Sequence, residues 1–223
     1  MFPDLAPLWL SLKVATAATV GVALVGAPAA LLLARRRFPG KALAAGLLTL
    51  PLVLPPTVLG YVLLQAFGRR TWLGGWLERS LGVTLVFHWS GAVVAAAVTA
   101  FPLFLLPARG AFEAVDPRLE DAARLLGRGE ASVFLAVTLP LAWRGLAAGL
   151  ALAFARALGD FGATMMVAGN IPGLTQTAAL AIYDAVQIGD SRRAALLSLG
   201  VSTISIAALA FVQRTAPGRG ARS

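Results

Sequence analysis

The residues best suited to recognition lie in one polar stretch, residues 120–127, which is set between long apolar segments. Its acids, alanines and arginine are all compatible with a helix. Gly127 follows where such a helix would end, since glycine adopts the left-handed C′ conformation without steric cost. The adjacent Ala122 and Ala123 would let the helix lie close against a partner surface, where added volume would overlap packed atoms. The chemistry expected here is docking of another protein.

A second break in the pattern follows at Leu139-Pro140. Proline is tolerated in the first turn of a helix and not in its interior, so we expect an apolar helix to begin here. The sequence therefore predicts a short helix, a glycine break, a second short helix and then re-entry into an apolar span. The alternative is an ordinary linker whose alanines merely favour helix.

Arg156 and Asp160 form a charged pair that could also carry chemistry. They are four residues apart, on one face of a helix and late in an apolar span. A lone charge in mid-membrane costs about 2.5–3.5 kcal/mol on insertion scales, so the pair should face protein or water. It either lines an exit path for a solute or forms a structural ion pair near the outer surface.

Several kinds of chemistry are excluded by residue type. The chain has no cysteine, which excludes disulfides, thiol catalysis and cysteine-based metal sites. His88 is the single histidine, so a metal site is not expected. The chain also lacks the Gly-x-x-x-x-Gly-Lys-Ser/Thr sequence that cradles nucleotide phosphates, so we expect no ATPase activity and no other enzyme activity.

The composition indicates an all-α membrane protein. Hydrophobic residues make up 58% of the 223 residues, and the mean hydropathy is +0.80. Apolar runs long enough to cross a bilayer predict about five transmembrane helices, or six, in one domain covering residues 1–223. The predicted spans are residues 12–34, 42–66, 90–108, 138–160 and 194–213. The net charge of +9 is spread between these spans, which favours membrane orientation over nucleic-acid binding.

Two segments interrupt the regular helical pattern. Pro51, Pro55 and Pro56 break the second span before Thr57, and broken backbone of this kind is tolerated where it meets protein or a water-lined path. A kink that only shapes packing is the equal alternative. Residues 170–173 (Asn-Ile-Pro-Gly) form a turn, and residues 174–190 resemble a helix at the outer face.

Loop charges predict the topology. Residues 35–41 carry four basic residues, and residues 109–137 carry four arginines with five acids. Both loops are therefore expected in the cytoplasm, with the N-terminus outside and the basic C-terminus inside. The outer loop, residues 68–90, contains three arginines that suit attraction of an anion or docking of a partner. Gly145 and Gly149 predict close approach of two helices.

The polar stretch resembles the signature loop of bacterial ABC-transporter permeases, which reads Glu-Ala-Ala, three residues, Gly, nine residues and Ile-x-Leu-Pro. Asp121 replaces the first glutamate, although Glu120 precedes it, and Val137 replaces the isoleucine. The resemblance implies a type I ABC importer permease fold, with a cytoplasmic coupling helix that docks into a cleft of the ATPase subunit. The coupling loop would cover about residues 111–137. The residues implied in coupling are Glu120, Asp121, Ala122, Ala123, Gly127, Leu139 and Pro140.

Further stretches resemble the molybdate/tungstate, or oxyanion, branch of these permeases. They include residues 11–15, 38–43, 50–56, 152–164 and 170–173, so the resemblance covers most of the chain. It implies transport of molybdate or tungstate, with sulfate ABC permeases sharing much of the pattern. The candidate residues for the translocation path are Pro55, Pro56, Thr57, Arg156, Asp160, Thr164 and Asn170.

The resemblance also implies the partners. They are a second copy of this chain, two cytoplasmic ATPase subunits, and a periplasmic or extracellular oxyanion-binding protein, in the inner membrane of a bacterial or archaeal cell. ATP and Mg would be bound by the ATPase, with no cofactor in this chain. The other interpretations are an ion-driven secondary anion transporter and a membrane scaffold. A secondary transporter should offer mid-span carboxylates and internal repeats, which are not evident here.

Overall fold

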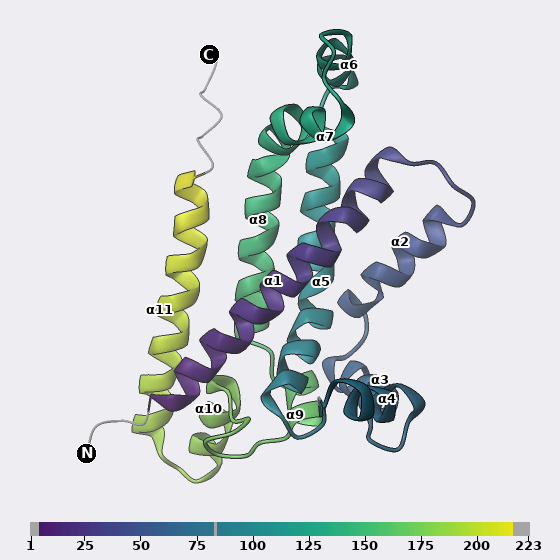
Figure 1. Cartoon of the computed structure of the whole chain (residues 1–223). Helices are drawn as coiled ribbons and strands as arrows, with labels where there is room; N and C mark the ends of the chain where they lie inside the picture. Colours follow the sequence, from purple (N-terminus) through teal and green to yellow (C-terminus); the bar gives the residue numbers. More distant parts are fainter. Residues whose placement is uncertain (1–4, 83, 216–223) are drawn as a thin grey trace.

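Long helices dominate the computed structural model, which describes residues 5–82 and 84–215. Four helices lie side by side and are long and apolar enough to cross a membrane (Figure 1). They are α1 (Ala6–Arg35), α5 (Trp89–Glu113), the helix Glu130–Leu158, whose last part is α8 (Leu139–Leu158), and α11 (Ser191–Thr215). The described residues contain no strand, which confirms the predicted all-α class. The predicted basic tail beyond residue 215 lies outside the described residues.

The second predicted span is broken, as its prolines indicate. It comprises α2 (Lys41–Thr49), the short 3₁₀ turn η1 (Leu50–Leu52) and α3 (Pro56–Phe67). The two arms meet at 111°. Proline cannot donate a backbone hydrogen bond inside a helix, so Pro51, Pro55 and Pro56 end one arm and begin the next. Counted as one span, this bent pair brings the number of candidate membrane crossings to five.

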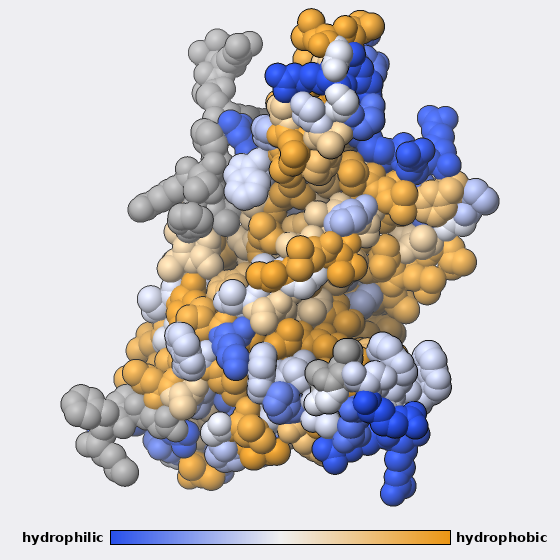
Figure 2. Space-filling view, viewed as in Figure 1, coloured by the Kyte–Doolittle hydropathy of each residue, from blue (hydrophilic) through white to orange (hydrophobic). Residues whose placement is uncertain are grey.

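Small residues allow α1, α5 and α8 to pack closely into one core. Ala15, Ala18, Ala96 and Ala100 are fully buried in it, with Phe104 filling the larger spaces. A Cβ atom added to Gly149 would lie 3.0 Å from the Phe104 carbonyl oxygen. This contact confirms the close approach predicted from the glycine pair. Large apolar side chains on the outward faces give the surface a broad hydrophobic zone between two more hydrophilic ends (Figure 2).

The two ends of the molecule carry different short helices. The helices α6 (Pro117–Leu125) and α7 (Glu130–Val133) lie at the upper end of Figure 1, toward which the α1–α2 loop also points. The lower end carries α3, α4 (Trp72–Leu81), α9 (Gly162–Ala168) and α10 (Ala178–Gln187). The two loops predicted to share one side of the membrane therefore do share one end. The predicted turn at residues 170–173 is also present, with Gly173 at φ +76°.

Helix α4 was not predicted, although its local signals are in the sequence. The Thr71 hydroxyl oxygen accepts a hydrogen bond from the Gly74 N–H at 3.1 Å and so caps the helix. Gly82 ends it in the left-handed conformation, with φ +64°. A threonine cap and a glycine separated by the ten residues of the helix therefore mark a short helix inside the predicted loop 68–90.

The predicted helix start at Leu139-Pro140 coincides with the start of α8, but no break in the helix precedes it. The helix is continuous from Glu130 to Leu158 and contains a π turn, η2 (Phe134–Thr138), immediately before Pro140. The Leu139 N–H donates to the Phe134 carbonyl oxygen, five residues earlier, and Pro140 has no N–H to donate. The wider π turn accommodates the proline inside the helix, where a break was expected.

Candidate coupling surface and translocation path

Both ends of helix α6 are capped by residues adjacent to it in the sequence. At its start, the Asp116 carboxylate accepts a hydrogen bond from the Arg118 N–H at 2.9 Å, and Pro117 occupies the first turn. At its end, Gly127 has φ +81°. The N–H groups of Gly127 and Arg128 donate to the carbonyls of Arg124 and Ala123 at 2.9 and 3.2 Å, which is the Schellman arrangement. The left-handed Gly127 predicted from the sequence is confirmed.

The two faces of α6 differ in burial. Glu120 and Ala123 face the rest of the chain and are each only 8% exposed. Ala122 faces outward, and Leu125 and Leu126 are 89% and 83% exposed. Figure 2 shows an apolar tip at this end with hydrophilic side chains beside it. The expectation that both alanines face a partner is therefore wrong, because Ala123 already packs within its own chain.

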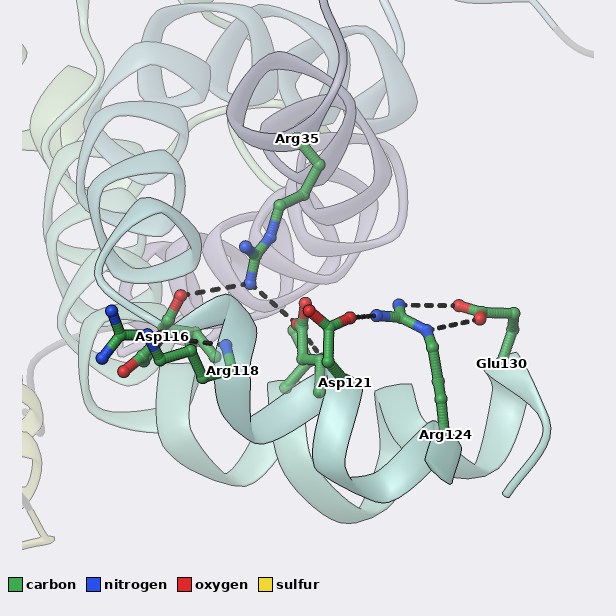
Figure 3. Close-up of polar contacts among 9 residues, drawn as sticks. Arg35, Asp116, Arg118, Asp121, Arg124 and Glu130 are labelled. Atoms are coloured by element: carbon green, nitrogen blue, oxygen red, sulfur yellow. Dashed lines mark hydrogen bonds and ion pairs between the residues drawn. The ribbon is translucent and has the colours of Figure 1, made fainter. Parts of the chain in front are cut away.

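A buried carboxylate fixes α6 to two spans. Glu120 Oε1 forms an ion pair with Arg35 Nη2 at 2.7 Å and accepts a hydrogen bond from Thr138 Oγ1 at 2.6 Å. Arg35 ends α1, and Thr138 is the last residue of the π turn. Figure 3 shows Arg35 reaching from its helix toward α6. From the sequence, Arg35 is only a topology signal, because it lies 85 residues from Glu120 and no local spacing pairs the two.

The outer side of α6 carries an exposed ion-pair network. Arg124 contacts Asp121 Oδ1 at 2.7 Å and both carboxylate oxygens of Glu130, at 2.7 and 3.1 Å (Figure 3). These two carboxylates raise the pKa of the Arg124 guanidinium above its ordinary value, Glu130 being the larger cause. The network spans the Gly127 break and joins α6 to α7. It is exposed to solvent, so its main effect is on the geometry of the loop and less on stability.

A groove of about 690 Å³ separates the end of α1 from α6, α7 and the π turn. Its lining includes Leu32, Arg36, Phe134 and the three residues of the Arg35–Glu120–Thr138 contact. Two polar contacts therefore connect elements that are otherwise partly separated at this end of the molecule.

The predicted path residues fall into three groups. Pro55, Pro56 and Thr57 are exposed at the start of α3. A Cβ atom added to Gly162 would lie 3.0 Å from Pro56 Cβ, so the start of α3 packs directly on the start of α9. Asn170 is half-buried and donates through Nδ2 to Asp184 at 2.8 Å, beside Gln176, which donates to the same carboxylate at 2.7 Å.

The third group surrounds Asp160, which lies between α8 and α9. The α8 helix ends at Leu158, so Asp160 is not on its helical face as predicted. Its side chain is 1% exposed and lies 3.2 Å from Arg156 Nη2. It accepts hydrogen bonds from the Thr164 N–H and hydroxyl at 3.0 and 2.7 Å, and from the Thr99 hydroxyl at 3.2 Å. Thr99 comes from α5, 61 residues away in the sequence, and was not predicted to belong to this group.

No cluster of three or more potential metal ligands occurs within residues 5–82 and 84–215. His88 instead caps α5, with its Nδ1 atom 3.3 Å from the Ser90 N–H that donates to it. This observation fits an interfacial helix-capping role for the single histidine.

A protein-family profile described as the binding-protein-dependent transport system inner membrane component matches residues 26–220. The chain belongs to this family. It is therefore a multi-pass membrane permease subunit of the ABC importer class, as the signature loop and the apolar helices indicated.

Relatives cover nearly the whole chain. The molybdenum transport system permease protein ModB of Escherichia coli strain K12 is 45% identical over 224 residues, which cover 99% of this chain and 98% of that protein. The protein of the same name from Haemophilus influenzae is 43% identical over 207 residues, covering 92% and 90%. The sulfate transport system permease protein CysW of Synechococcus elongatus is 35% identical over 193 residues, covering 85% and 67%.

Solved structures share the fold. An inward-facing structure of the MetNI methionine ABC transporter aligns with a TM-score of 0.65 at 17% identity, covering 94% of this chain and 91% of that one. An amino acid ABC transporter aligns with a TM-score of 0.62 at 18% identity, covering 95% and 92%. These similarities confirm the type I importer permease fold predicted from the signature loop.

Proposed function

We propose that this chain is the permease subunit of an ATP-driven importer for molybdate. The observation that carries the proposal is the combination of an outward apolar tip on α6 with relatives named for molybdenum transport over nearly the full length. The sulfate relative is less similar and aligns over a smaller share of both chains. This difference favours molybdate, or the similar tungstate, over sulfate.

Docking of an ATPase subunit on α6 is the proposed origin of the driving force. Leu125 and Leu126 are exposed at the tip, and apolar side chains of this size contribute to affinity when a partner removes them from water. Ala122 lies on the outward side and leaves room for a close partner. The ATPase would bind ATP and Mg, and this chain would hold no cofactor. Coupling would pass through Glu120, Asp121 and Gly127 into the helix that contains Leu139 and Pro140.

The translocation path would form between two copies of this chain. Pro55, Pro56 and Thr57 are exposed in a single subunit, so a second copy or a solute can reach them. The buried Asp160 and Thr164 would shape this region from behind, leaving the partly exposed Arg156 as the cation available to an oxyanion. Asn170 would act near the outer end. An oxyanion-binding protein would deliver the anion at the end that carries α4 and α10, with the α6 end in the cytoplasm.

Reconstitution tests the proposal directly. The chain would be purified with its ATPase and incorporated into proteoliposomes, with the binding protein supplied on the α4 side. We expect uptake of radiolabelled molybdate that requires ATP and both partners, and that excess sulfate does not inhibit. Uptake driven by an ion gradient without the ATPase would instead establish a secondary transporter. Equal uptake of sulfate would place the chain in the sulfate branch.

A further inference from the structure

We infer that Glu120 is a positioning residue that transmits movement of α6 to α1 and to the π turn through Arg35 and Thr138. This inference rests on the proposed function, because it assigns the internal half of the coupling surface. The outward half of α6 meets the partner, and Glu120 on its opposite face connects that helix with the spans.

The contact geometry supports transmission through one atom. Glu120 Oε1 meets both Arg35 Nη2 at 2.7 Å and Thr138 Oγ1 at 2.6 Å. The partners lie 85 and 18 residues away in the sequence, on separate elements. Arg35 also lies within 3.5 Å of the Val115 carbonyl oxygen, in the turn that leads into α6. The two spans are thus joined through a single carboxylate, so α6 cannot shift without moving them or breaking these bonds.

Breaking these contacts costs free energy because Glu120 and Thr138 are buried. Glu120 is 8% exposed and Thr138 is 3% exposed, and the Arg35 side chain is 24% exposed. Hydrogen bonds to charged groups are stronger than neutral ones, and separating a buried carboxylate from its donors leaves a charge that water cannot fully solvate. The outer Asp121–Arg124–Glu130 network has no such constraint, because it is exposed to solvent.

The position of Thr138 gives the contact a mechanical consequence. Thr138 ends the π turn, and Pro140 interrupts the regular hydrogen-bond pattern just beyond it. π turns mark places where a helix departs from its regular geometry, and they occur frequently at functional sites. A force applied at Thr138 therefore acts where the helix Glu130–Leu158 departs from regular α-helical hydrogen bonding.

Two substitutions test the contact while preserving shape. Glu120→Gln keeps an acceptor for Thr138 and removes the charge that pairs with Arg35. Thr138→Val replaces the hydroxyl with a methyl group of similar size. In the full complex with ATPase and binding protein, we expect normal subunit association and basal ATP hydrolysis. Molybdate uptake per ATP hydrolysed should fall about tenfold, the effect expected from losing one charge-assisted hydrogen bond. Thr138→Ser keeps the hydroxyl donor, so its uptake per ATP hydrolysed should match that of the parent chain.

A matched control is Glu113→Gln, which breaks an exposed ion pair of 2.8 Å within α5. It should leave the uptake-to-hydrolysis ratio unchanged. An unchanged ratio in Glu120→Gln and Thr138→Val would overturn the inference. So would a loss of ATPase association or thermal stability that accounts for the whole loss of uptake, since Glu120 would then serve only to hold the loop together.

A distance measurement separates this inference from the proposed function. The chain has no cysteine, so cysteines introduced in place of Arg37 and Arg118 would be the only sites that take a thiol-reactive spin label. Double electron–electron resonance, on doubly labelled chain diluted with unlabelled chain so that only distances within one subunit are measured, should give one narrow distance distribution in the parent and a broad one in Glu120→Gln. If uptake never depends on the ATPase but the distribution still broadens, the proposed function fails and the connection stands. If the distributions are identical, the connection itself is refuted.

Discussion

Removing Arg156 provides the strictest test of the Asp160 cluster. The Asp160 side chain is 1% exposed, and Arg156 is the cation paired with it, at 3.2 Å. Arg156→Leu would leave this carboxylate buried without its counter-charge. Breaking a buried ion pair costs about 3–5 kcal/mol. Three donors, two from Thr164 and one from Thr99, remain within 3.2 Å. They continue to solvate the carboxylate, so we expect a cost near the lower limit, about 3 kcal/mol.

The double substitution Arg156→Leu with Asp160→Asn should be more stable than Arg156→Leu alone. Asparagine carries no charge, its oxygen can accept from the Thr164 N–H, and a threonine hydroxyl can rotate to accept from its amide. We expect the double variant to recover about 1–3 kcal/mol, the usual cost of leaving a buried polar group unsatisfied. Asp160→Asn alone should be the mildest change, since the partly exposed Arg156 retains access to solvent.

Denaturant titration of the purified subunit, followed by tryptophan fluorescence, would measure these differences. The expected order of stability is the parent chain, Asp160→Asn, the double variant and then Arg156→Leu. If Arg156→Leu were as stable as the parent, or no less stable than the double variant, the electrostatic argument would be wrong. A double variant that folds normally but fails in uptake would assign Arg156 to the translocation path in addition.

Three further predictions concern the α6 loop and the topology. Ala122→Leu should leave the chain stable and prevent co-purification with the ATPase, whereas the inward Ala123→Leu should lower thermal stability by about 1–3 kcal/mol through overpacking; the opposite pattern would mean that the faces of α6 are wrongly assigned. Gly127→Val should destabilise the loop by about 1–2 kcal/mol, measurable by proteolysis of the loop, because φ +81° is costly for a side chain with a Cβ atom. Arg37→Cys should resist a membrane-impermeant thiol reagent in intact cells, and its rapid labelling would reverse the proposed orientation.

Much of the fold could be predicted from the sequence because its causes are local. Apolar runs specify spans, since a bilayer requires a certain helix length and leaves no partners for a free backbone. Pro51, Pro55 and Pro56 broke the second span because proline removes a backbone donor. Gly127 was assigned a left-handed conformation because it follows a helix end. Two features were nevertheless not predicted: the Thr71 cap of α4, and the continuity of the helix through Pro140, which a π turn accommodates.

The polar contacts of the site depended on tertiary packing. Sequence spacing brought Asp160 near Arg156, but only the approach of α5 added Thr99 and buried the carboxylate. Likewise, the resemblance to the permease signature loop implied a coupling role for Glu120, while its burial and its pairing with Arg35 and Thr138 required three elements to meet. The same packing turned Ala123 inward and left Ala122 outward. The sequence by itself determined which segments are helical and where they break, because these depend on neighbouring residues and the surrounding solvent. Only the tertiary structure decided which polar atoms meet, because that depends on the angles at which distant helices cross.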